Sequence, residues 1–435
     1  MRILIYGINY FPELTGVGKY TGEMAEWLAA QGHQVRVVTA PPHYPAWRVA
    51  KGYSPWRYSR TCQAGVEVFR CPVWLKTQPT GVERLVHLLS FALTSLPVML
   101  AQVFWKPEVV LTIEPPLLAA PTALLVARLS GAHSWLHIQD HEVDAAFELQ
   151  SLPGGGRLQR TAVGFERWLL KHFDRLSTLS LQMLERAVGK GVERERIGLF
   201  PNWVDTGRIH PDISADALRR ELGLTAEDLV VLYSGNMGGK QGLDLLLAAA
   251  DRLPRVQFVL CGDGTARRRL KSESCRLALA NVHFLPLQPT ERLGELLNLA
   301  DIHALIQRDQ AADLVMPSKL AGMMASGRAV IATARPGTAV ATMVTASACG
   351  ALVPPENVDA FVLAVQELAA APRLRREMGR NGRNWARDYL AKGLILSQFT
   401  AQLLQLCSGT VPLVIPDAGL EEASGTLRTA DVDGE

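Results

Sequence analysis

The sequence predicts an α/β protein built from two doubly wound parallel sheets in tandem. Short apolar runs alternate with longer amphipathic stretches, which is the pattern of strands and crossover helices in a parallel sheet. The runs fall into two series that are separated near residues 200–205. The length of 435 residues exceeds one ordinary core and suits two domains of about 150–200 residues each.

The apolar runs of the two series are interpreted as strands. They cover residues 2–6, 34–39, 66–70, 109–113 and 134–138 in the first series, and 229–234, 256–261, 282–285, 302–306 and 329–332 in the second. Amphipathic segments at 19–31, 243–252 and 293–299 predict helices, and Gly32 is a suitable C-cap for the first of them. Each series is therefore expected to form a Rossmann-like domain.

The break between the series sets the expected domain boundaries. Residues 1–200 form an N-terminal domain and residues 201–407 a C-terminal domain, with packing of the last helix on the N-terminal domain left open. The polar stretch from Pro201 to Asp216 is interpreted as a linker. Residues 408–435 contain glycine, proline and acidic residues without helical periodicity, so we expect a disordered tail.

The composition argues against several classes of protein. A net charge of +3 without a concentrated basic stripe gives no sign of a nucleic-acid partner. None of the six cysteines forms a C-x-x-C pair, which argues against a zinc ribbon or a disulfide scaffold. The first apolar run is a strand rather than the core of a signal peptide, so we expect a cytoplasmic protein.

The loop after the first strand is the first candidate binding element. Gly16 and Gly18 are candidates for binding a diphosphate, because they allow close approach of a ligand to the backbone and the helix that follows favours an anion at its N-terminus. A dehydrogenase would place G-x-G-x-x-G directly after the strand, whereas here about nine residues intervene after Gly7. A loop that only turns the chain is the alternative.

Titratable residues gather where the strand at 134–138 ends. His137 and Asp140 are the candidate catalytic residues, because ligands of open α/β sheets bind at the carboxyl ends of the strands. His137, Asp140 and His141 follow no established metal-ligand spacing, so we expect no metal. A solvated loop is the alternative interpretation.

Two strand-to-helix loops of the second series suit a diphosphate. The first contains Gly235, Asn236 and Lys240, which supply backbone N–H groups and a cation without forming a P-loop. The second contains Gly262 and Gly264 after the strand at 256–261 and is the candidate nucleotide-binding turn.

A third element of the second series begins a helix. Pro317, Ser318 and Lys319 form a helix start at which Ser318 and Lys319 are candidates for holding a phosphate. A plain helix start is the alternative.

In order and spacing, these elements resemble the family 4 retaining glycosyltransferases of the GT-B fold over residues 1–406. The resemblance rests on the first glycine loop, on the segment 199–205, and on the segments 234–242, 262–264 and 316–330. It implies that a nucleotide sugar binds in the cleft between an acceptor-binding N-terminal domain and a donor-binding C-terminal domain. It also implies transfer without a metal or other cofactor, with Asp140 and His137 orienting the donor sugar or the acceptor hydroxyl.

A closer resemblance is to the bacterial colanic-acid-type exopolysaccharide glycosyltransferases. It is carried by residues 6–20, 39–42 and 316–320. These enzymes are commonly described as fucosyltransferases, so the resemblance implies a donor such as GDP-fucose and a lipid-linked oligosaccharide acceptor.

The chain departs from the family pattern at the donor site. Asn236 stands where the family often has arginine, and Gln241 falls on its lysine position. The second glutamate of the E-x7-E motif aligns with Gly322, and the first aligns near Leu314. Nucleotide recognition is therefore expected to differ in detail from the family pattern.

The segment 85–105 contains no Lys, Arg, Asp or Glu and is long enough to span a membrane. Because a true span would separate the first sheet from its own crossover helix, we expect a partly buried helix seated in the membrane interface. An ordinary core helix is the alternative. Peripheral association with the cytoplasmic face of the inner membrane would suit a lipid-linked acceptor.

Two other functions stay open from the sequence. A nucleotide-sugar epimerase of the GT-B fold would use cleft carboxylates such as Asp140 and Glu142 without an acceptor. The missing E-x7-E glutamates also allow a non-catalytic, degenerate transferase that acts within an assembly.

Overall fold

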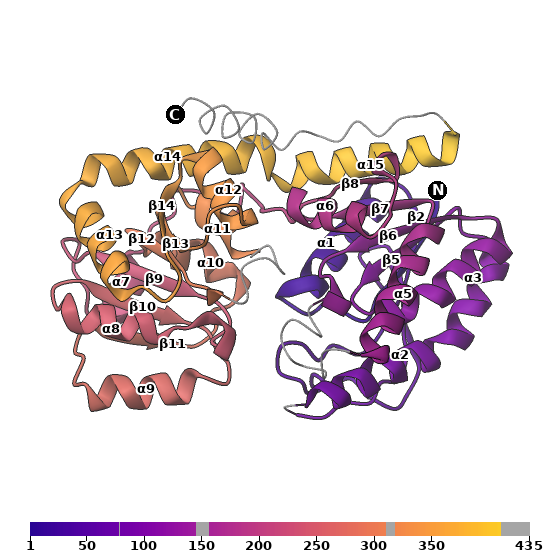
Figure 1. Cartoon of the computed structure of the whole chain (residues 1–435), viewed down its shortest axis with the longest axis horizontal. Helices are drawn as coiled ribbons and strands as arrows, with labels where there is room; N and C mark the ends of the chain where they lie inside the picture. Colours follow the sequence, from indigo (N-terminus) through magenta and orange to yellow (C-terminus); the bar gives the residue numbers. More distant parts are fainter. Residues whose placement is uncertain (78, 145–155, 310–317, 410–435) are drawn as a thin grey trace. The chain divides into compact units, whose positions relative to one another are not determined.

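The computed structural model describes residues 1–77, 79–144, 156–309 and 318–409 (Figure 1). The chain divides into two compact units, of which the first contains Met1–Pro201 and the described residues from Leu396 to Gly409. The second unit contains Asn202–Ile395. The division lies within the break that the sequence predicts near residues 200–205.

The first unit is built on a sheet with the strand order β3-β4-β2-β1-β5-β6-β7-β8. Neighbouring strands are parallel except β3 and β4, which are antiparallel. The strands are β1 (Arg2–Tyr6), β2 (Gln34–Thr39), β3 (Ser59–Gln63), β4 (Val66–Arg70), β5 (Val109–Glu114), β6 (His133–Ile138), β7 (Arg175–Thr178) and β8 (Ile197–Leu199).

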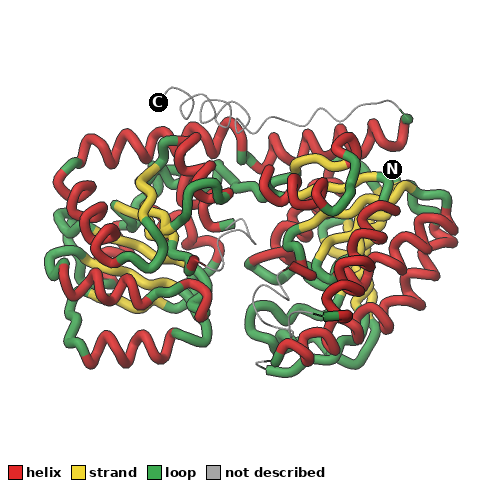
Figure 2. The backbone as a smooth tube through the Cα atoms, viewed as in Figure 1, coloured by secondary structure: helices red, strands yellow, loops and turns green. Residues whose placement is uncertain are grey.

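Helices cover both faces of this sheet (Figure 2). They are α1 (Gly16–Ala30), α2 (Gly81–Ala101), α3 (Ala120–Ser130), α5 (Arg157–His172), α6 (Leu181–Gly189) and α15 (Lys392–Ser408). Helix α2 begins with a capping box in which Thr80 and Glu83 each accept a hydrogen bond from the other's backbone N–H. Its buried residues, among them Phe91 and Met99, pack in a core with Leu4 and Tyr6 of β1.

The second unit is built on a fully parallel sheet with the order β11-β10-β9-β12-β13-β14. Its strands are β9 (Val230–Ser234), β10 (Gln257–Cys261), β11 (Val282–Leu285), β12 (Ile302–Leu305), β13 (Ala329–Thr333) and β14 (Gly350–Val353). Its helices are α7 (Asp216–Glu221), α8 (Asp244–Arg252), α9 (Arg267–Arg276), α10 (Leu293–Asn298), α11 (Lys319–Ala325), α12 (Ala339–Ser347), α13 (Val358–Ala370) and α14 (Pro372–Tyr389).

Alternate residues of β9 enter cores on opposite faces of this second sheet. Val231 and Tyr233 pack with helices α8 and α13, whereas Val230 and Leu232 pack with residues of α7 and α10. Because both faces of β9 are buried, this strand is almost continuously apolar, which explains why the sequence predicts it clearly.

The last helix, α15, packs on the first unit. Phe399 stacks on Phe200 with a centroid distance of 4.1 Å and meets Trp135 edge-on at 5.2 Å. The indole N–H of Trp27 donates to the hydroxyl of Thr400 at 3.3 Å. This packing places residues from the C-terminal end of the domain expected at 201–407 in the core of the N-terminal unit.

The structure corrects two expectations. The stretch from Pro201 to Asp216 is not a linker, because Val204, Ile209 and Ala215 are buried in the cores of the second unit. Helix α1 begins at Gly16 rather than at Lys19, so the glycine loop forms its first turn. The predicted tail at 408–435 lies outside the described residues beyond residue 409.

Candidate functional site

The loops that follow β9 and β10 interlock at the carboxyl edge of the second sheet. A Cβ added at Gly262 would lie 1.9 Å from the carbonyl oxygen of Gly235, and one added at Gly264 would lie 2.5 Å from that of Met237. The N–H of Met237 donates to the carbonyl oxygen of Asp263 at 2.7 Å. These glycines are therefore required by the contact between the two loops, which together form one closely packed backbone edge.

Lys319 lies directly over this edge. A Cβ at Gly235 would lie 2.4 Å from its Cε, and its Nζ donates to the hydroxyl of Tyr233 at 3.0 Å. Tyr233 in turn donates to the carbonyl oxygen of Asn236 at 2.5 Å. Burial lowers the pKa of the Lys319 amine to about 8. The amine also lies 4.5 Å from the centroid of the Tyr233 ring, and no ion pair joins it to a carboxylate of the described residues.

Three further residues predicted to bind the diphosphate belong to the same unit as this lysine. Asn236 is exposed, and its side chain packs beside Gly264. Ser318 directly precedes α11 without capping it through its side chain. Lys240 lies in the 3-10 turn Gly239–Gln241, and its side chain lies outside what the structure describes.

In the first unit, the two glycines of the first loop have different surroundings. Gly16 adopts a φ of +64°, and a Cβ there would lie 3.3 Å from the ring of Tyr44. A Cβ at Gly18 would lie 2.4 Å from a carboxylate oxygen of Glu13. The room at Gly18 that the sequence assigned to a ligand is thus filled by Glu13, whereas the room at Gly16 faces the ring of Tyr44.

Glu13 is buried, with 4% of its surface exposed, and ties the loops after β1 and β2 together. Its Oε1 accepts hydrogen bonds from the backbone N–H groups of His43 at 2.8 Å and Tyr44 at 2.9 Å. Its Oε2 accepts a hydrogen bond from the side-chain amide of Asn9 at 2.9 Å. The network fixes the backbone on which Tyr44 is presented.

His137 and Asp140 occupy different environments at the end of β6. His137 is only 3% exposed, and its ring nitrogens lie 3.0 Å from the hydroxyl of Ser177 and 3.1 Å from the amide of Gln139. Burial lowers its pKa to about 3, so it is neutral and engaged with protein groups. Asp140 is half-buried in the loop beyond the strand. This geometry favours Asp140 as the catalytic candidate and a structural role for His137.

A buried charge cluster lies near this loop. Lys190 donates to Glu166 at 2.7 Å and to Asp144 at 2.9 Å. Glu142 accepts from the backbone N–H of Leu117 at 2.7 Å, and burial raises its pKa to about 7. Burial and the charge of Glu166 also raise the pKa of Glu114 well above its usual range. These groups make the folding of the first unit sensitive to pH.

Comparison with known families gives two matches that span most of the chain. Residues 15–203 match the Glycosyl transferase 4-like domain, and residues 214–385 match Glycosyl transferases group 1. The colanic acid biosynthesis glycosyl transferase WcaI of Escherichia coli is 43% identical over 408 residues, which cover 92% of this chain and 98% of that protein. The chain belongs to the family 4 glycosyltransferases of the GT-B fold.

More distant family members are also similar along most of their length. The GDP-mannose-dependent alpha-(1-6)-phosphatidylinositol monomannoside mannosyltransferase of Mycolicibacterium smegmatis is 28% identical over 391 residues, covering 87% of this chain and 92% of that protein. The solved sucrose-phosphate synthase of Thermosynechococcus elongatus aligns with a TM-score of 0.74 at 21% identity, covering 94% of this chain and 100% of that chain. The GT-B fold predicted from the sequence is thereby confirmed.

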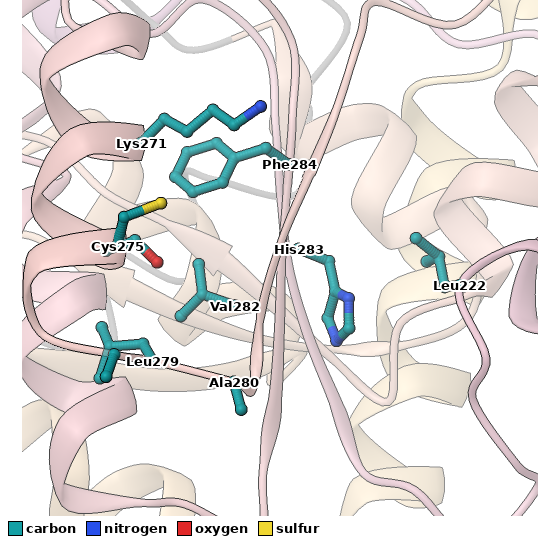
Figure 3. A pocket seen from close by; sticks show the side chains of 10 residues that line it. Leu222, Lys271, Cys275, Leu279, Ala280, Val282, His283 and Phe284 are labelled. Atoms are coloured by element: carbon teal, nitrogen blue, oxygen red, sulfur yellow. The ribbon is translucent and has the colours of Figure 1, made fainter.

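A separate pocket of about 440 Å³ lies at the outer edge of the second sheet. Figure 3 shows Lys271 and Cys275 of α9 opposite Val282, His283 and Phe284 of β11. None of the residues predicted to bind the donor lines this pocket. Among the described residues, no group of three or more His, Cys, Asp or Glu side chains is placed to hold a metal ion.

Sequence reasoning missed three residues at the carboxyl edge of the first sheet, namely Glu13, Tyr44 and Arg70. The available signal was Glu13, a lone carboxylate between Pro12 and Leu14 in an apolar loop. Its partners could not be found from spacing, because the contacts join loops about 30 residues apart.

Proposed function

We propose that this glycosyltransferase moves a sugar from a nucleoside diphosphate sugar to a lipid-linked exopolysaccharide acceptor of the colanic acid type, with retention at the sugar carbon. The observation that carries the donor assignment is the Lys319 amine over the loops after β9 and β10. The name of the 43% identical relative, which refers to colanic acid biosynthesis, supports the acceptor class.

The reaction breaks the bond between the sugar carbon and the diphosphate oxygen. The acceptor hydroxyl oxygen forms the new bond on the same face of the sugar, and its proton goes to the departing diphosphate. Lys319 stabilises the negative charge that develops on that leaving group, which is electrostatic catalysis by a preorganised cation. Asp140 orients the acceptor hydroxyl or the donor sugar, and no metal takes part.

The donor is tested by thermal unfolding with millimolar GDP, UDP, GDP-fucose and UDP-glucose. We expect guanine nucleotides to stabilise the protein, with GDP-fucose as the first candidate donor. A ligand present at 100 times its dissociation constant adds about 2.7 kcal/mol to the stability of the native state. Stabilisation by UDP alone would reassign the base, and no stabilisation by any nucleotide would contradict the donor site.

Because the proposed acceptor is lipid-linked, the proposal includes contact of the enzyme with a membrane surface. The segment Gly81–Trp105 has a mean hydropathy of 1.7 and only 28% of its most apolar window is buried. Val82, Leu85, Val86, Leu89 and Leu93 are exposed along α2, and Phe104 beyond it is 88% exposed. Arg84 on α2 and Arg128 at the end of α3 supply positive charge for anionic headgroups. The enzyme is then peripheral on the cytoplasmic face.

Sedimentation with vesicles of phosphatidylcholine and phosphatidylglycerol tests this contact. The variant Leu89→Glu/Leu93→Glu places charge on the exposed face and is expected to lose vesicle binding without losing the nucleotide response. The matched control Leu363→Glu changes an exposed leucine of α13 in the other unit and is expected to keep both. Equal sedimentation of all three proteins would contradict the membrane proposal.

Product analysis separates this function from the epimerase alternative. A transferase releases the nucleoside diphosphate and lengthens the acceptor, whereas an epimerase converts the nucleotide sugar without any acceptor.

A further inference from the structure

An aromatic side chain stands exposed at the carboxyl edge of the first sheet. Tyr44, in the loop after β2, has 40% of its surface exposed. The edge of its ring lies over Gly16 at the start of α1, where an added Cβ would be 3.3 Å from Cε1. An exposed aromatic ring at the ligand-binding edge of an α/β sheet is a surface for the apolar face of a sugar.

Residues of other elements act on the hydroxyl group of this ring. The pKa of the Tyr44 hydroxyl is raised by burial and then by the negative charges of Asp140 and Glu13, while Arg84 lowers it. Tyr44 follows β2 and Asp140 follows β6, and both strands are parallel members of the same sheet. The two side chains therefore come from loops at the same carboxyl edge of the first sheet.

The backbone that carries Tyr44 is held unusually firmly. Glu13 accepts the N–H groups of both His43 and Tyr44, as well as the amide of Asn9. Arg70, at the end of β4 and only 3% exposed, adds a second tie between the same two loops. It donates to the carbonyl oxygen of Ala40 at 3.0 Å and to that of Phe11 at 2.6 Å. Burying two charged side chains to join two loops is costly unless the loop position matters.

We infer that Tyr44 is a substrate-contacting residue on which one hexose unit of the acceptor stacks, and that Glu13 is the positioning residue that holds Tyr44 in place. This inference rests on the proposed function and adds the residues that hold the acceptor. Because Tyr44 and Asp140 belong to loops at the same carboxyl edge of the first sheet, this inference puts the acceptor on the side of the sheet that carries the candidate catalytic carboxylate.

The probes are octyl glycosides of glucose, galactose, mannose and fucose, each offered as acceptor with the donor whose nucleotide stabilises the protein. Each probe carries a single sugar on a short apolar chain, so it tests the stacking of one hexose unit on Tyr44. Tyr44→Ala is expected to raise the acceptor KM roughly threefold to tenfold, the equivalent of one lost aromatic contact. Tyr44→Phe keeps the stacking surface and is expected to stay within about twofold of the wild type.

Glu13 variants separate positioning from a chemical role of the carboxylate. Glu13→Gln keeps an oxygen for the N–H groups of His43 and Tyr44, and the Asn9 amide can turn to accept from the new amide. It is expected to keep kcat and acceptor KM. Glu13→Ala leaves the two N–H groups without their acceptor and is expected to raise the acceptor KM while leaving nucleotide stabilisation unchanged. A loss of kcat in Glu13→Gln would overturn the positioning role.

Asn281→Ala is the matched control for a loss of buried hydrogen bonds. Asn281 is 7% exposed and donates to the carbonyl oxygens of Ala250, Leu253 and Val256, in the other unit. It is expected to lower the melting temperature with no change in acceptor KM. An acceptor KM that rises in this control as it does in Glu13→Ala would mean that general destabilisation explains both.

Different results would contradict the role of Tyr44 and the proposed function. If no nucleotide stabilises the wild type, the proposed function fails and this inference falls with it. If nucleotides stabilise it but no octyl glycoside is used, recognition of a single hexose is wrong. If the wild type transfers and Tyr44→Ala keeps its acceptor KM, or changes only the donor KM, Tyr44 does not hold the acceptor.

Discussion

Replacing Lys319 by methionine is expected to weaken nucleotide binding without lowering the stability of the ligand-free protein, and so it tests the donor site. Methionine keeps most of the length of the side chain over Gly235 but removes the charge. A hydrogen bond to a charged group contributes about 1.5–3 kcal/mol, so we expect the dissociation constant for the nucleotide to rise about tenfold to a hundredfold. The ligand-free variant is expected to be at least as stable as the wild type, because burial disfavours the charged amine and lowers its pKa to about 8.

Because the pKa of Lys319 is about 8, nucleotide binding is expected to depend on pH. Below pH 8 the Lys319 amine is mostly protonated and can hold a diphosphate, and above pH 8 it becomes neutral. Nucleotide affinity of the wild type is therefore expected to fall between pH 7 and pH 9, while that of Lys319→Met stays flat. Isothermal titration at three pH values measures both curves.

Lys271→Met is the matched control for this experiment. Lys271 is exposed on α9 and lines the separate pocket, so its replacement is expected to leave nucleotide binding unchanged. Binding by Lys319→Met within twofold of the wild type at pH 7 would refute the argument, and so would a parallel pH response in the two proteins.

Three further predictions address other parts of the molecule. Asp140→Asn is expected to lower kcat about a hundredfold or more with nucleotide stabilisation retained, and near-normal turnover would remove its assigned role. Gly262→Ala is expected to lower the melting temperature and abolish nucleotide stabilisation, because its Cβ would lie 1.9 Å from the carbonyl oxygen of Gly235. Gly239→Ala is the control and is expected to change neither, because a Cβ there has no neighbouring atom within 4 Å. Burial raises the pKa of Glu142 to about 7, so the protonated carboxyl group stabilises the folded state. This contribution is complete below the pKa of Glu142 in the unfolded chain and is lost as the pH rises toward 7. Denaturant unfolding should therefore show Glu142→Gln gaining stability relative to the wild type between pH 5 and pH 8.

The strands that the sequence predicts are runs of mostly apolar residues. Runs such as β1 and β13 are buried along almost their whole length, and their bounds differ from the prediction by at most one residue. Among the described residues, four strands are not predicted. All five residues of β3 (Ser59–Gln63) are exposed at the edge of the sheet, and β7, β8 and β14 have only three or four residues each. Tertiary pairing rather than local apolarity makes these segments strands.

The prediction of a linker before Asp216 is wrong for a related reason. A polar stretch with a proline is typical of a linker, but its few apolar residues, Val204 and Ile209, are buried in the second unit. The backbone of Val204 also pairs with Leu390 and Lys392 near the start of α15. The pairing partners lie almost 200 residues away in sequence, so local composition cannot reveal them.

The departures of this chain from its family at the donor site have a common structural explanation. Gln241, which falls on the lysine position of the family, uses its Oε1 to accept the N–H of Gly238 at 3.0 Å and so closes the loop on itself. Asn236, where arginine is frequent, is packed beside Gly264. Neither residue brings a positive charge to the loop after β9. Lys319 reaches the same backbone edge from α11, and the absence of a Cβ at Gly235 leaves it the space to do so. Lys319 of α11 thus adds an amine to this edge in addition to Lys240 of the loop itself, and we expect Gly235 and Lys319 to be retained together.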